Sequence, residues 1–110
     1  MQSIFDEIAA ERQKQETKWG RQDHPILDPG LIGRSPDRMC EEYEIPTEGR
    51  AKQKTDTMAR RGTQTYMHIL VEEVSEAASC DSNTEALRKE LIQIASVAVA
   101  MIESLDRNGR

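Results

Sequence analysis

Two neighbouring helical segments, joined by a very short turn, constrain the fold of this chain more than any other feature. Apolar residues recur at helical spacing over 63–79, and the pattern resumes over 84–107, beyond the turn "CDSN". The apolar stripe of the second segment comprises Leu87, Leu91, Ile94, Ala98, Met101 and Leu105. Because so short a turn favours antiparallel packing of the helices on either side, the sequence predicts a helical hairpin.

A further helix is expected at the start of the chain, followed by a long loop. The helix should run from about residue 3 to residue 18, with Ile4, Ile8 and Phe5 facing inward. All four prolines of the chain fall within 20–46, which predicts an irregular connection. Loops of this length in a compact domain are usually functional or disordered.

The remaining helix, over 48–61, is strongly basic and follows Thr47, a candidate N-cap. No segment alternates as a strand, so residues 1–110 are predicted to form a single all-α domain, a four-helix bundle with a long loop after the first helix. With 36% apolar residues the core is modest, and the apolar run from Leu91 to Ile102 exceeds what one hairpin partner covers. We therefore expect a homodimer or homotetramer.

The charge of the chain argues against two classes of partner. A net charge of −5 and a pI near 5.1 disfavour binding to a nucleic acid polymer or to an anionic membrane, since both require a basic surface. The longest uncharged run, "LIQIASVAVAMI", is shorter than the ~20 residues of a membrane span, and the charged N-terminal segment is unlike a signal peptide. Cys40 and Cys80 lack CxxC spacing, so a cytoplasmic protein with reduced thiols is expected.

Carboxylates interrupt the apolar pattern of the predicted hairpin. Glu72, Glu73 and Glu76 lie on one segment with no lysine or arginine between them, although like charges at this spacing repel. Glu90 and Gln93 repeat the three-residue spacing after the turn, so antiparallel packing would bring the two pairs face to face. Oxygen ligands on facing helices suit Mg²⁺ or Mn²⁺. The alternative is that these glutamates form the solvated face of an amphipathic helix.

The sequence resembles a known family at these positions. "EEVSE", followed by "ELIQ", is similar to the ExxE…ExxD signature of the MazG-like all-α nucleoside triphosphate pyrophosphohydrolases, which include dimeric dUTPases and phosphoribosyl-ATP pyrophosphohydrolase. The stretches "ERQKQETKWGRQDHP", "IPTEGRAK" and "ELIQIASVAVAMIESL" look like a branch common in actinobacteria and their phages. The resemblance implies an oligomeric helical bundle in which Mg²⁺ and water cleave a nucleotide between its α- and β-phosphates. The products would be a nucleoside monophosphate and pyrophosphate.

The resemblance assigns roles to individual acidic residues. Glu73 and Glu76 match ExxE, Glu90 matches the first position of ExxD, and these three are the expected metal ligands. Gln93 stands where the family has aspartate and is the expected fourth ligand, or else a residue that hydrogen-bonds a neighbouring helix. Glu72 matches a glutamate that often precedes the motif, and it is expected to orient water, to serve a second ion or to form a salt bridge.

Candidate substrate-binding residues lie elsewhere. Lys18, Trp19, Gln22 and His24 fall within seven residues, and the tryptophan could stack on a nucleobase or simply plug the end of the bundle. Four basic residues of 48–61 could neutralise a triphosphate or form a solvated face, namely Lys52, Lys54, Arg60 and Arg61. The predicted function is Mg²⁺-dependent hydrolysis of a nucleotide, and the rival is a non-catalytic nucleotide-binding or protein-interaction module of the same fold.

Overall fold

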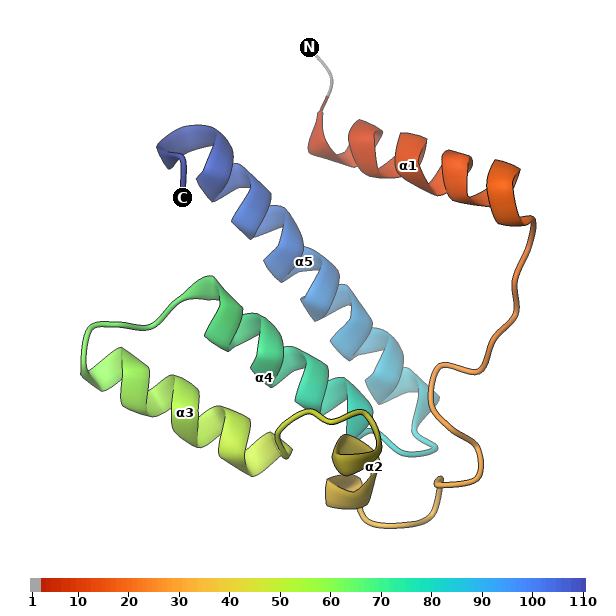
Figure 1. Ribbon diagram of the computed structural model, residues 1–110, viewed down its shortest axis with the longest axis vertical. Helices are drawn as coiled ribbons and strands as arrows, with labels where there is room; N and C mark the ends of the chain where they lie inside the picture. Colours follow the sequence, from red (N-terminus) through yellow and green to blue (C-terminus); the bar gives the residue numbers. More distant parts are fainter. Residues whose placement is uncertain (1–2) are drawn as a thin grey trace.

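The computed structural model describes residues 3–110, which form five α-helices and no β-strand (Figure 1). The helices are α1 (Ile4–Trp19), α2 (Pro36–Glu42), α3 (Glu48–Arg60), α4 (Tyr66–Ala78) and α5 (Thr84–Asn108). The all-α prediction is therefore confirmed. No helix within residues 3–110 has the length and apolar character that crossing a bilayer requires.

Short polar side chains fix where the helices begin. Ser3 caps α1 and Thr47 caps α3, each by accepting a hydrogen bond from an amide in the first turn, and Asn83 caps α5 in the same way. Thr65 caps α4, with the His68 side chain completing a capping box. The prediction that this helix starts at residue 63 is therefore wrong by three residues.

The helix α2 corrects the prediction of an uninterrupted loop over 20–46. Ser35 accepts a hydrogen bond from the amide of Arg38, and Pro36 occupies the first turn, where its missing N–H group costs nothing. The helix buries Met39 and Cys40 against α4, and the chain therefore has five helices rather than four.

The helix α4 is the centre of the fold. It packs against α5 on one side and α3 on another, and α2 lies across its C-terminal part (Figure 1). The core cluster contains Leu27, Met39, Cys40, Ala77, Ala78 and Leu87. Small side chains at the C-terminal end of α4 allow its neighbours to approach closely, and the core is correspondingly small.

The expected inward face of α1 is exposed, and that of α5 is exposed only in part. The helix α1 buries none of its residues, and Phe5 is 70% exposed. On α5, Leu87 is buried as predicted, but Leu105 is 57% exposed. The exposure of Leu105 follows from the length of α5, which extends well beyond the end of α4 (Figure 1).

Truncation of Met39 should destabilise the protein. Met39→Ala removes a side chain that is 3% exposed and leaves a void beneath α2, so the free energy of unfolding should fall by about 2–5 kcal/mol. The matched control is Met67→Ala, because Met67 is exposed and should change it by less than ~1 kcal/mol. Urea unfolding followed by circular dichroism measures both, and equal losses would contradict this view of the core.

Candidate metal centre

The turn between α4 and α5 brings acidic residues of the two helices together. Asp81 takes the left-handed conformation, with φ of 54°, and Asn83 then caps α5. The reversal places the C-terminal part of α4 beside the N-terminal part of α5 (Figure 1). Glu73 and Glu76 consequently meet Glu90 across the hairpin, and this predicted meeting of three carboxylates is confirmed.

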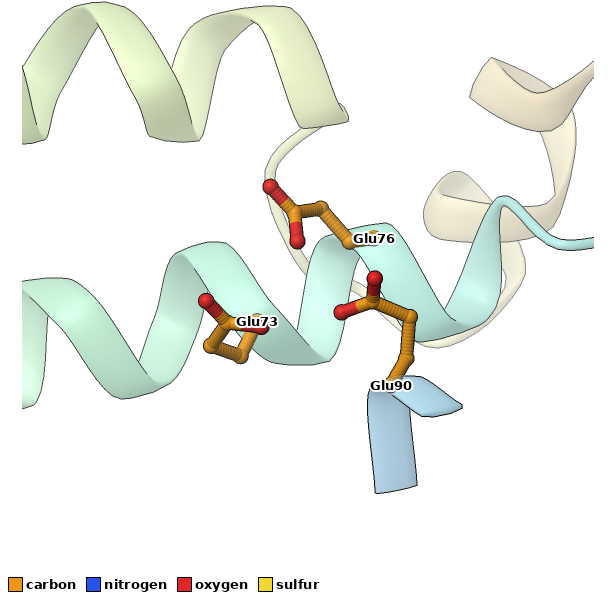
Figure 2. A group of neighbouring side chains, drawn as sticks. All are labelled: Glu73, Glu76 and Glu90. Carbon is orange, nitrogen blue, oxygen red and sulfur yellow. The ribbon is translucent and has the colours of Figure 1, made fainter. Parts of the chain in front are cut away.

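These three residues form a compact cluster of carboxylates, drawn in Figure 2. One oxygen from each of Glu73, Glu76 and Glu90 lies within 4.8 Å of the other two, and all three residues are half-buried. The Oε2 atoms of Glu73 and Glu90 are shielded from solvent and have no hydrogen-bond partner within residues 3–110. Two buried, unsatisfied carboxylate oxygens are costly to a fold unless a further group binds them.

The negative charges of the clustered carboxylates lie close together, without a positively charged partner among residues 3–110. Burial, the neighbouring Glu90 carboxyl and the negative charge of Glu73 raise the pKa of Glu76 from 4.5 to about 7. Burial and then Glu90 also raise the pKa of Glu73. In the part of the chain that the structure describes, the ion pairs lie elsewhere and none includes a member of the cluster.

The cluster has the chemistry of a site for a hard divalent cation. Carboxylate oxygens are the preferred ligands of Mg²⁺ and Mn²⁺, and an ion would provide partners for the unsatisfied oxygens of Glu73 and Glu90. Mg²⁺ usually keeps several waters and binds few protein carboxylates, so three carboxylates suffice. The residues present therefore fit the expected Mg²⁺.

Glu72 and Gln93 lie beside the cluster. Glu72 is half-buried on α4, and its negative charge adds to the forces that raise the pKa of Glu73 and Glu76. Gln93 follows Glu90 by three residues on α5, and its side chain is exposed. The predicted ligand role of Gln93 stays a prediction.

Glu48 is a residue that the sequence analysis did not connect with this site. It occupies the first turn of α3. The pKa of the Cys80 thiol is raised first by burial and then by the negative charges of Glu90, Glu48 and Glu76. The start of α3 therefore lies in the same electrostatic environment as the carboxylate cluster. An acidic residue directly after the N-cap Thr47 is the sequence signal of a helix start, but it does not indicate which other helix lies nearby.

The structure brings together the predicted residues at the end of α1. Trp19, Gln22 and His24 line one hollow of about 680 Å³, and Trp19 is 60% exposed. The Nζ atom of Lys18 lies 4.7 Å from the centre of the Trp19 ring, a cation–π contact. An exposed indole beside polar side chains remains available for stacking.

Lys52 and Arg60 are exposed on α3, and neither lines the two hollows that border this helix. Arg60 instead donates a hydrogen bond to Thr57 within its own helix. Arg50 and Lys54 of α3 line these hollows, and so does Arg61, the C-cap residue of α3. Lys54 was among the predicted residues, and the signal that could have found Arg50 is its four-residue spacing from Lys54, which places both on one helix face.

Comparison of the whole chain with models of protein families, with curated proteins and with solved structures finds no match.

Replacing the Glu76 carboxylate should make the stability of the metal-free protein less dependent on pH. Because folding raises the pKa of Glu76 from 4.5 to about 7, the folded protein binds this proton more tightly than the unfolded chain. The resulting stabilisation is present below pH 4.5 and is lost as the pH rises through about 7. Glu76→Gln is neutral throughout, so its melting temperature relative to the wild type should rise from pH 5 to pH 8.

Melting curves in a chelator measure this difference. The control is Glu103→Gln, an exposed position on α5 outside the cluster, which should follow the wild type at each pH. If the melting temperatures of the wild type and Glu76→Gln changed in parallel with pH, the pKa of Glu76 would not be raised by folding.

Proposed function

We propose that this protein is a Mg²⁺-dependent nucleoside triphosphate pyrophosphohydrolase. The observation that carries the proposal is the cluster of Glu73, Glu76 and Glu90, with its two unsatisfied buried oxygens on facing helices. The reaction class comes from the resemblance of "EEVSE" and "ELIQ" to the MazG-like signature. The proposed reaction is attack of water between the α- and β-phosphates, which yields a nucleoside monophosphate and pyrophosphate.

In this proposal the three clustered glutamates hold the ion. Bound Mg²⁺ supplies charge stabilisation for the phosphates and lowers the pKa of bound water. The facing arrangement of α4 and α5 fixes the ligands on rigid helices, which keeps them oriented before substrate arrives. Glu72, half-buried on the same helix, would orient the attacking water or accept its proton.

The proposed nucleotide contacts lie on α1 and α3. Trp19 presents an exposed ring for stacking on the base, and Gln22 and His24 line the same hollow and can hydrogen-bond its edge. Lys18 adds a positive charge beside the ring, and the exposed Lys52 and Arg60 of α3 supply charge for a triphosphate.

Loss of a clustered carboxylate should abolish hydrolysis while the fold persists. In Glu76→Gln the rate of pyrophosphate release from a panel of nucleoside triphosphates should fall by about a hundredfold or more, because the ion loses a charged ligand. Release should require Mg²⁺ or Mn²⁺ in the wild type, and Glu103→Gln should keep the wild-type rate. Absence of metal-dependent release from every nucleotide would favour the non-catalytic module instead.

The proposed oligomer should form through the exposed apolar part of α5. Ile92 and Leu105 are both more than half exposed, and Met101 and Ile102 between them are half-buried, which leaves apolar surface that a second copy would cover. Light scattering should give a dimer or tetramer at micromolar concentration. Leu105→Asp should shift the mass toward the monomer and Glu103→Gln should not, whereas a monomeric wild type would contradict the proposal.

A further inference from the structure

A hollow of about 500 Å³ lies between α3 and α4. None of Glu73, Glu76 and Glu90 lines it. Its apolar lining comes from Pro46, Ala51, Met67 and Val71. We call it the α3–α4 hollow.

The polar groups at the base of this hollow are already satisfied. Thr55 is buried there, and its hydroxyl lies 3.0 Å from the Ala51 carbonyl oxygen and 3.3 Å from that of His68. These contacts join α3 to α4 and occupy the hydroxyl proton. The base of the hollow therefore favours an apolar group, since a polar ligand atom would find few free partners there.

Two cations border the hollow without compensation. Arg50 and Lys54 are four residues apart on one face of α3, and both line the hollow with exposed side chains. Within residues 3–110, neither has a carboxylate oxygen at ion-pair distance. Two adjacent positive charges repel each other, and an anion placed between them would relieve that repulsion.

His68 adds a donor whose tautomer is fixed by the capping box of α4. The Thr65 amide lies 3.0 Å from His68 Nδ1 and donates to it, so Nδ1 accepts and carries no proton. In the neutral imidazole the proton is therefore on Nε2, which remains available as a donor. His68 also lines the hollow, beside the apolar Met67 and Val71.

We propose that the α3–α4 hollow binds a small organic phosphate, with a flat apolar body on the hollow's apolar lining and the phosphate between Arg50 and Lys54. Two cations match the double negative charge of a phosphate monoester better than the single charge of a carboxylate. The hollow's volume falls within the range of ordinary small-molecule sites. The inference goes beyond the proposed hydrolysis, because it requires neither the metal nor the carboxylate cluster.

Phenyl phosphate, titrated into the full chain in a chelator, tests the proposal. Calorimetry should show one site per chain, and backbone amide shifts should concentrate on 50–55 and 67–71. Inorganic phosphate carries only the anionic group and phenol only the aromatic ring, so each should bind at least about fivefold more weakly than phenyl phosphate. Arg50→Gln and Lys54→Gln should each weaken phenyl phosphate by about threefold or more.

Matched controls separate the site from general attraction to positive charge. Lys89→Gln removes the same charge from an exposed position on α5, outside the hollow, and should leave the affinity unchanged. Glu76→Gln should also bind phenyl phosphate normally, so the outcome does not depend on the proposed enzyme activity. The proposal would be overturned by an absence of binding, by equal weakening in Lys89→Gln, or by inorganic phosphate that binds as tightly as phenyl phosphate.

Discussion

The hydrogen bond from Ser75 to the carbonyl oxygen of Pro46 is the contact on which the arrangement around α4 depends. Ser75 is fully buried, and its Oγ lies 2.8 Å from that oxygen, which fixes the start of α3 against the middle of the fold. Cys40 of α2 packs onto the same turn of α4, and its Sγ atom lies 3.7 Å from the Ser75 carbonyl oxygen. A larger side chain at this position would separate three elements at once. Glu76, the next residue, points into the carboxylate cluster (Figure 2).

The carboxylate cluster opposes the folding that creates it. Burial and mutual repulsion both favour the protonated form of Glu76. Near neutral pH the folded protein therefore either retains that proton or loses part of its free energy of unfolding. A bound divalent cation would reverse this balance, because it satisfies the orphaned oxygens and compensates the charge. Metal affinity and folding stability are therefore coupled through the same three side chains.

The sequence predicts those parts of the molecule that local spacing controls. The hairpin and the meeting of its three glutamates follow from a short turn and the helical repeat, and the cap at Thr47 follows from side-chain chemistry. The helix α2 was missed because Ser35 and Pro36, a valid helix start, lie in a proline-rich tract that reads as loop. The exposed α1 and the hollow beside Arg50 depend on which surfaces meet in space, and helical periodicity does not specify a partner.

Because α5 is longer than α4, only one part of α5 packs against the core. At 25 residues α5 is about 37 Å long, against about 20 Å for the 13 residues of α4, so the two cannot be matched along their length. The half near Leu87 is held by the core, whereas the half near Leu105 relies on its intrinsic helix propensity and on Gly109 at its C-cap. Local unfolding of the isolated chain should accordingly begin at the C-terminal end of α5 and proceed toward its N-terminal end. The turn of α5 that contributes to the carboxylate cluster should therefore be among the last to unfold.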